Sequence, residues 1–299
     1  MPNVFNYATN FERTIENAYR QGAMSGALGT SPARFINAHT IQIPRLDVGG
    51  YKEHDRAGGW NRQSLTNTWE PKTLTHDRNV QFFVDVMDVD ETNLVTSAAN
   101  VTAEFLRSQA IPEVDSYRFS KLYYEYVEVF GQEADDTELT SANVLEVFDE
   151  FIRRADEAEV PTEGRMLYVT PTVEKLLKNA AQVTRSIDVR NAGALNRVVT
   201  ALDNITLRPV PSSRMLTAYD FTDGVEPGVE AGQINMILVH PTAVLSPIKH
   251  SAIYLKGPEQ HDQGDGWLYQ NRMYMDLFLL ERKVPGVYIN VTPGEEDED

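Results

Sequence analysis

The stretch that decides the fold is residues 76–118, which read HDRNVQFFVDVMDVDETNLVTSAANVTAEFLRSQAIPEVDSYR. Its middle predicts one long helix over 91–110. Apolar residues recur there at the spacing of a helix face: Leu94, Ala98, Val101 and Phe105. Twenty residues at about 1.5 Å each make a rod roughly 30 Å long. Asp88 and Asp90 place acids at its positive N-terminal end, and Pro112 is expected to end it before a second helix begins.

Upstream of this helix, the pattern of polar, apolar and glycine residues predicts an extended β-hairpin. Thr40 to Ile43 alternates between polar and apolar residues, and residues 48–60, VGGYKEHDRAGGW, form a polar tip with paired glycines at each end. The tip has too few apolar residues to fold onto a core of its own, so we expect it to meet a partner. The predicted interface residues are Gly49, Gly50, Tyr51, Lys52, Glu53, Arg56, Gly58, Gly59 and Trp60.

Residues 1–38 predict an arm that carries one amphipathic helix. Phe11 and Ile15 fall at helical spacing with Ala18 or Tyr19, and glycines from Gly22 onward interrupt the pattern. An arm with so little apolar content must lie on another surface or stay disordered.

Downstream of the helix, the chain predicts a separate α/β unit over 131–240. Met166 to Val169 is a short buried strand, and Thr170-Pro171 is a helix cap followed by a proline in the first turn. Further strands are expected at 205–210 and 234–239, with a polar loop between them. Residues 266–291 are rich in strand-forming residues, and the last residues form an acidic tail.

The composition excludes several classes of protein. Asp and Glu number 44 against 27 Lys and Arg, a net charge of −17, of which −12 remains without the acidic run at 295–299. Such a chain has no overall electrostatic reason to coat nucleic acid or an anionic membrane. The absence of cysteine excludes disulfides and thiolate sites. The longest apolar run, Ile234 to Val239, is too short to span a membrane, and the N-terminus does not resemble a signal peptide. We therefore expect a soluble protein made in a cytoplasm.

The sequence contains no standard phosphate-binding loop, metalloprotease motif or serine-hydrolase elbow. The best candidate for a metal site is the acidic group Asp85, Asp88, Asp90 and Glu91, which lacks the glycine that a calcium loop needs for its sharp turn. We interpret these acids as partners of the following helix dipole. His240, before Pro241, is interpreted as a hydrogen-bonded boundary histidine. No catalytic, cofactor-binding or metal-ligating residue is predicted.

Several motifs together resemble the major capsid proteins of tailed phages of Gram-positive bacteria. The first group is His76-Asp77-Arg78, Phe82-Phe83-x-Asp85, Met87-Asp88-x-Asp90-Glu91-Thr92-Asn93, Phe105-x-Arg107 and Ile111 to Arg118. The second is Ile234-Asn235-Met236, His240 to Val244, Gly266-Trp267 and Gln270-x-Arg272-x-Tyr274-x-Asp276-Leu277-Phe278. The similarity is specific at 76–118 and 234–278 and loose over about 130–230.

The resemblance implies an α+β protein with the Hong Kong ninety-seven capsid fold. Its expected parts are an N-terminal arm (1–38), an extended hairpin loop (39–80), a peripheral domain (81–130) with a spine helix (91–110), an axial α/β domain (131–240), a completion of the peripheral domain (241–291) and the acidic tail (292–299). In this fold the arm and the hairpin lie across neighbouring subunits.

The resemblance also implies a structural rather than an enzymatic function. The chain would self-assemble as hexamers and pentamers into the icosahedral head that encloses phage double-stranded DNA. Expected partners are copies of itself, a portal protein, a separate scaffolding protein and packaged DNA without sequence-specific contact, with a decoration protein left open. No membrane partner and no cofactor are expected. The protein would be located in the virion after assembly in the host cytoplasm.

Two alternatives remain open from the sequence. An encapsulin-type shell would need the same subunit geometry together with a groove for a cargo peptide. A metal-dependent hydrolase would use Asp85, Asp88 and Asp90. Electron microscopy of the expressed protein separates shells from a small monodisperse enzyme.

Overall fold

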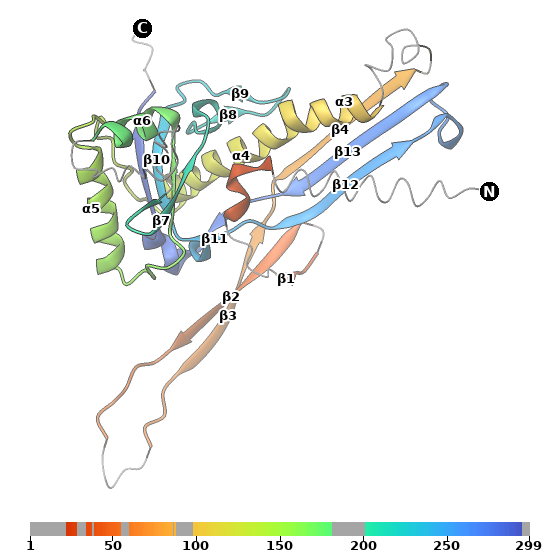
Figure 1. The fold of residues 1–299 in the computed structure, drawn as a ribbon. Coiled ribbons are helices and arrows are strands. Elements are labelled where there is room, and N and C mark those ends of the chain that lie inside the picture. Colours follow the sequence, from red (N-terminus) through yellow and green to blue (C-terminus); the bar gives the residue numbers. More distant parts are fainter. Residues whose placement is uncertain are drawn as a thin grey trace, which may run out of the picture.

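A hairpin of two strands projects from a body built of a long helix and two larger sheets (Figure 1). The computed structural model describes residues 22–28, 34–37, 39–54, 60–85, 87, 98–180 and 201–294. Helices and strands are both abundant, so the α+β class predicted from the sequence is confirmed. None of the helices in these ranges is long and apolar enough to cross a membrane.

The long helix does not end at Pro112, as the sequence pattern predicted, but continues to Val129. Four segments follow one another without a break: α3 (Ala98–Phe105), the π-helical turn η2 (Leu106–Ala110), α4 (Ile111–Tyr124) and the π-helical turn η3 (Glu125–Val129). A proline ring clashes with the carbonyl four residues earlier in a regular α-helix. The Ile111 N–H bonds instead to the Leu106 carbonyl, five residues back. This wider turn accommodates the proline. The predicted start at Glu91 lies outside the described residues.

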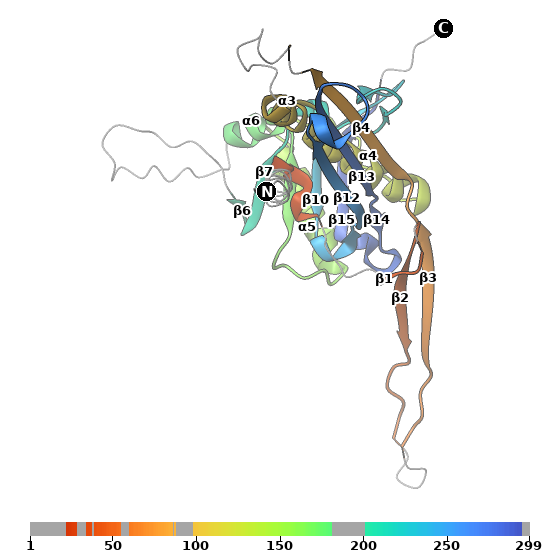
Figure 2. The ribbon, with the colours of Figure 1, turned by 90° about the vertical axis from the view of Figure 1, so that its right-hand side faces the viewer.

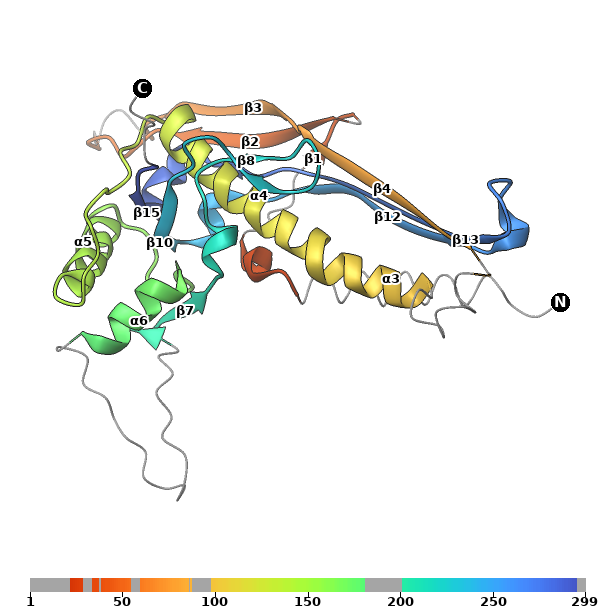
Figure 3. The ribbon, with the colours of Figure 1, turned by 90° about the horizontal axis from the view of Figure 1, so that it is seen from above.

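An antiparallel sheet of three strands lies against this helix (Figure 3). Its order is β12 (Ile248–Lys256), β13 (Gly266–Met275) and β4 (His76–Asp85). The packed side chains are Val80, Phe82, Phe105, Leu106, Ala110, Ile253, Leu255 and Tyr269. β4 runs across the expected boundary between residues 80 and 81, because all ten of its residues pair with β13.

A sheet of five strands forms the second part of the body. Its order is β15 (Val287–Thr292), β10 (Gln233–Val239), β5 (Met166–Val169), β7 (Ile205–Pro209) and β6 (Ala201–Leu202), with only β5 and β7 parallel. All but the last residue of β15 lie within residues 241–291, the range expected to complete the peripheral domain, and the strand pairs in this sheet with β10. Five consecutive residues of β15 are buried, so the strand needs cover on both faces. Pairing with β10, between two apolar clusters, provides that cover.

Helices cover both faces of the sheet of five strands. On one face, α5 (Val144–Glu157) and α6 (Pro171–Asn179) bury an apolar cluster that includes Phe148, Phe151, Val173 and Leu177. On the other face, Phe119 and Leu122 of α4 join a second cluster. As predicted, Thr170 caps α6, and its hydroxyl accepts the Val173 N–H at 3.4 Å.

The short helix η1 (Met24–Ala27) docks onto α4 through a buried carboxylate. Asp115 is fully buried and accepts hydrogen bonds from the Ser25 N–H (2.9 Å), the Ser25 hydroxyl (2.6 Å) and the Met24 N–H (3.2 Å). Arg214 donates to the same carboxylate at 3.2 Å. Leu28, just after η1, is buried in the apolar cluster beneath. A charged anchor therefore fixes where the N-terminal part of the described chain crosses the long helix.

Candidate assembly interface

The projecting hairpin is a regular antiparallel ladder. β2 (Thr40–Val48) pairs with β3 (Leu65–Thr73) from Thr40 opposite Thr73 to Val48 opposite Leu65. The short strand β1 (Arg34–Phe35) pairs with the other edge of β2. Nine residues at about 3.3 Å each extend the ladder roughly 30 Å from its base. Figures 1 and 2 show it pointing away from the body in both views.

The base of the hairpin is anchored in the body by apolar packing. Ile41 is completely buried in a cluster with Leu74, Leu245, Tyr274 and Phe278. The Tyr274 hydroxyl donates to the Leu74 carbonyl at 2.9 Å, and the Leu74 N–H donates to the His39 carbonyl at 2.8 Å. The direction in which the hairpin leaves the body is therefore set at its first residues.

A buried carboxylate, Asp276, ties this base to the long helix. Its side chain is 1% exposed and accepts hydrogen bonds from the Thr75 N–H (2.8 Å), the Tyr117 hydroxyl (2.8 Å) and the Leu277 N–H (2.7 Å). Burial, together with the negative charge of Asp276, raises the pKa of Tyr117. The phenol therefore stays protonated and remains a donor.

One face of the hairpin stem is polar and contacts the body. Arg45 forms an ion pair with Glu281 at 2.5 Å. Arg282 forms an ion pair with Asp47 and donates to the Leu46 carbonyl at 2.9 Å. The side chains of these ion pairs are about half exposed, so each pair adds little stability. Their effect is to select the face of the stem that is turned toward the body.

The opposite face of the stem is exposed and largely apolar, with Asn67, the cross-strand partner of Leu46, as its polar residue. Side chains alternate along a strand and cross-strand partners share a face, so Leu46, Val48, Leu65 and Trp69 lie on one side of the ladder. Their exposed fractions are 54%, 68%, 69% and 42%. This surface, which we call the stem face, was not predicted from the sequence. The alternation in Pro44-Arg45-Leu46-Asp47-Val48 was the available signal.

The tip carries the interface residues predicted from the sequence. Gly50, Tyr51, Lys52, Glu53 and Trp60 are exposed, Gly49 is half-buried, and Arg56, Gly58 and Gly59 lie outside the described residues. Local hydrogen bonds hold the tip, from Gln63 to the Gly50 carbonyl (2.5 Å) and from Asn61 to the Glu53 carbonyl (2.7 Å). The described tip therefore presents aromatic side chains at the end of an ordered ladder.

Comparison with known structures identifies the fold of this chain. No protein-family model and no curated protein matches the sequence. The capsid structure of the cyanophage P-SCSP1u is 11% identical and covers 88% of this chain and 86% of its own, with a TM-score of 0.61. The mature capsid of bacteriophage PhiM1 is 14% identical over 84% of this chain and 81% of its own, with a TM-score of 0.57. The chain has the Hong Kong ninety-seven capsid fold.

The fold is also similar to that of a virus-like particle. A virus-like particle from Pyrococcus furiosus is 13% identical and covers 95% of this chain and 99% of its own, with a TM-score of 0.51. The identities of all three structures are low. The arrangement of the elements, rather than shared residues, therefore carries the assignment of the fold.

The acids considered for a metal site are only partly within the described chain. Asp85 accepts the Met87 N–H at 2.8 Å, whereas Asp88 and Asp90 lie outside the described residues. Across the ranges that the structure describes, histidines and acids form no group of three that could hold a metal ion. His240 is a hydrogen-bonded boundary residue, as predicted, and bonds to Thr242 and to the Glu163 carbonyl at 2.8 and 3.1 Å.

Proposed function

We propose that this chain is the major capsid subunit of a tailed bacteriophage. Copies of it assemble as hexamers and pentamers into an icosahedral head around double-stranded DNA. The observation that carries the proposal is the projecting hairpin of a capsid fold, with an apolar stem face and an aromatic tip exposed to solvent. Contiguous apolar surface of this kind marks a site of protein contact.

The hairpin is oriented for contact between subunits. The ion pairs of Arg45 and Arg282 hold the polar face of the stem against its own body. The stem face then points outward, where a neighbouring copy can cover it. The tip residues from Gly49 to Trp60 form the far end of the same interface.

For the parts of the subunit we propose the expected division with one change. The arm (1–38) and the hairpin loop (39–80) reach neighbouring copies, and the peripheral domain (81–130 and 241–286) contains the long helix and the sheet of three strands. The axial domain (131–240) gains β15, because that strand pairs with β10. The acidic run at 295–299 lies outside the described residues.

The charge of the subunit suits a container for DNA. A net charge of −17 gives the shell little affinity for the phosphate backbone, so the genome stays free to enter and leave. A portal protein and a scaffolding protein are the further partners expected of such a head, with a decoration protein left open. The role is structural, and the mature protein is located in the virion.

A second candidate within the same fold is an encapsulin-type cargo shell. The likeness to the virus-like particle from Pyrococcus furiosus, which covers nearly all of both chains, favours it. It differs from the first candidate in the content of the particle, which is protein cargo rather than packaged DNA.

Expression of the chain followed by sedimentation and cryo-electron microscopy tests the proposal. We expect hexamers, pentamers or closed shells. A stable monomer of 33.7 kDa across salt and pH would contradict both candidates. Particles purified from their natural source that contain DNA and a portal vertex support the phage head, and particles that contain protein cargo support the second candidate.

A further inference from the structure

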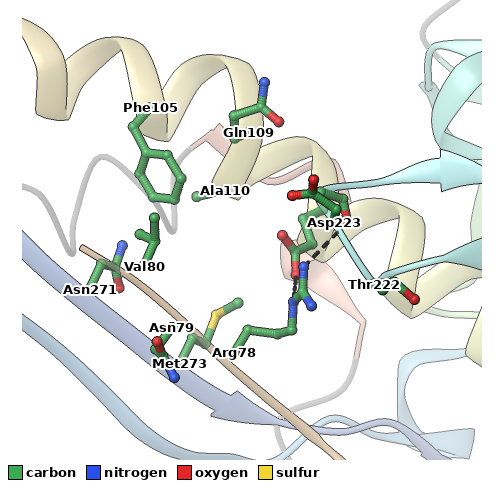
Figure 4. A pocket seen from close by; sticks show the side chains of 12 residues that line it. Arg78, Asn79, Val80, Phe105, Gln109, Ala110, Thr222, Asp223, Asn271 and Met273 are labelled. Atoms are coloured by element: carbon green, nitrogen blue, oxygen red, sulfur yellow. Dashed lines mark hydrogen bonds and ion pairs between the residues drawn. The ribbon is translucent and has the colours of Figure 1, made fainter. Parts of the chain in front are cut away.

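A pocket of about 310 Å³ opens between the long helix, the sheet of three strands and the loop after β8 (Tyr219–Asp220) (Figure 4). Val80, Phe105 and Met273 form an apolar interior, while Gln109, Thr222 and Asp223 place polar groups around it. This volume is at the small end of ligand pockets, which span about 300–1,000 Å³. It suits one large side chain with a polar atom at its edge.

The wall of the pocket is held in place by Arg78. Its guanidinium donates to Glu113 at 2.8 Å, to the Phe221 carbonyl through a short contact and to the Gly224 carbonyl at 3.3 Å. These bonds fasten the loop 221–224 to both the sheet and the long helix. The pocket is therefore formed before any occupant arrives, which lowers the entropy lost on binding.

The hairpin tip carries a side chain of matching chemistry. Trp60 is 95% exposed, and the nearest aromatic ring that the structure shows, His54, is 6.4 Å away between centroids. Tryptophan combines a large apolar surface with one N–H donor, and it is enriched among the residues that dominate the energy of protein interfaces. The indole N–H can find acceptors at the rim, where Gln109 and Asp223 lie.

The charges around the tryptophan and around the pocket are complementary. Lys52 and Arg62 belong to the same hairpin tip as Trp60, and neither forms an ion pair with the residues that the structure describes. Asp223 lines the pocket and is likewise without an ion pair within the described chain, whereas the guanidinium of Arg78 in the pocket wall is already paired with Glu113. Opposite charges at the two surfaces favour their encounter and fix its orientation.

We propose that Trp60 of one copy inserts into this pocket of a second copy. The inference rests on the proposed function, because it names the contact through which the subunits join. Insertion into the same chain is excluded by the ladder of β2 and β3, which directs the tip away from the body. The tryptophan and the pocket lie on different parts of the subunit, so their contact is head-to-tail. Such contacts close into a ring when the rotation between successive subunits allows it.

Disulfide trapping tests the proposal, because the natural chain has no cysteine. The variant N61C/T222C leaves Trp60 intact and places one thiol beside it and the other at the pocket. The matched control N61C/Y124C moves the second thiol from the loop after β8 to an exposed position on the long helix, about 20 Å along that helix from Gln109 of the pocket. After assembly and mild oxidation, we expect a covalent ladder of up to six subunits for N61C/T222C and at least tenfold less for the control.

The outcomes separate this proposal from the proposed function. Particles that form while N61C/T222C cross-links no better than the control would overturn the insertion of Trp60 and leave the capsid function standing. Failure of the unaltered chain to assemble would overturn both. A second variant, Trp60→Ala, should lower ring formation at least tenfold with an unchanged melting temperature, and normal yields of rings from it would also contradict the proposal.

Discussion

The Tyr117 hydroxyl donates a hydrogen bond of 2.8 Å to the Asp276 carboxylate, and this contact joins the long helix to the chain that follows β13. The same carboxylate receives the Thr75 N–H and hydroxyl at the base of the hairpin. Three segments far apart in the sequence therefore meet at one buried group. A shift of the helix relative to the sheet would be transmitted to the base of the hairpin through it.

Removal of the phenolic donor should destabilise the subunit without unfolding it. Tyr117→Phe deletes one hydrogen bond to a buried carboxylate, and Asp276 keeps its donors from Thr75 and Leu277. We expect a loss of about 1.5 kcal/mol in the free energy of unfolding, since hydrogen bonds to charged groups contribute about 1.5–3 kcal/mol. Urea denaturation of the unassembled subunit measures it, with the exposed Tyr124→Phe as control. An equal loss in the control would contradict the assignment.

The anchor of η1 should depend on Asp115. Asp115→Ala leaves the Ser25 N–H and the Arg214 guanidinium without their shared acceptor. Removing one partner of a buried ion pair costs about 3–5 kcal/mol, and we expect the lower value because Arg214 is 20% exposed. Hydrogen exchange should show faster exchange at residues 22–28. Ser25→Ala, which removes one hydroxyl only, should have a smaller effect in the same measurement.

Stability should depend on pH through Glu113. Burial acts to raise the pKa of Glu113, but contacts with His76 and Arg78 outweigh burial and hold this pKa below its ordinary value of 4.5. A carboxyl whose pKa is lowered by folding stabilises the fold at every pH above its ordinary pKa. This stabilisation is lost as the pH falls through the lowered pKa of the folded state. Glu113→Gln should therefore be less stable than the natural chain at pH 7, and the difference should shrink below about pH 4.5.

The control for this pH dependence is Glu104→Gln. Glu104 pairs with Arg107 on the exposed side of the helix, with both side chains well over half exposed. Its contribution to the free energy of unfolding should be small at every pH. Melting temperatures of the three chains from pH 3 to 7 provide the comparison. A constant difference between the natural chain and Glu113→Gln would contradict the lowered pKa.

Local patterns in the sequence were sufficient for much of the sheet of five strands and its helices. The buried strand from Met166, the cap at Thr170 and the strands near 205 and 234 are all present. Each depends on residues within a few positions of one another. The extension of the helix past Pro112 was not predictable in this way, because the π-helical turn that accommodates the proline has no distinct local pattern.

The missed features depend on contacts between distant residues. The strand β12 was not predicted, because its residues are of mixed polarity. It forms by pairing with β13, in a sheet that is buried on one face only. The polar tip of the hairpin was visible from its glycines. The stem face was not, because Arg282 and Asp47, which determine the face turned inward, are 235 positions apart.

Loss of the hairpin tip should separate folding from assembly. Replacing Gly49 to Gly59 with a short Gly-Ser turn removes few buried apolar groups, so the melting temperature should change little. Assembly should fail or give aberrant particles. In contrast, Phe105→Asp places an unpaired charge in the cluster between the helix and the sheet and should unfold the subunit. A tip deletion that melts the subunit as severely would show that the tip belongs to a core.

The stem face should be required for assembly even when the tip is intact. The double variant Leu46→Ser and Val48→Ser makes two side chains polar, each of which is more than half exposed in the natural chain. The ladder keeps its backbone hydrogen bonds. We expect a melting temperature within about 2 °C of the natural chain, since surface substitutions usually change stability by less than about 0.5 kcal/mol.

The yield of particles from this variant should fall at least tenfold, because the neighbouring copy would then bury hydroxyl groups where it now buries apolar surface. The matched control, Thr66→Ala with Thr68→Ala, changes the other face of the same ladder, opposite Asp47 and Arg45. Sedimentation of both variants provides the comparison. If the control loses assembly and the serine variant keeps it, the polar face is the interface between subunits, and the orientation argued from Arg282 and Glu281 is wrong. If both assemble normally, the hairpin contacts its neighbour through the tip alone.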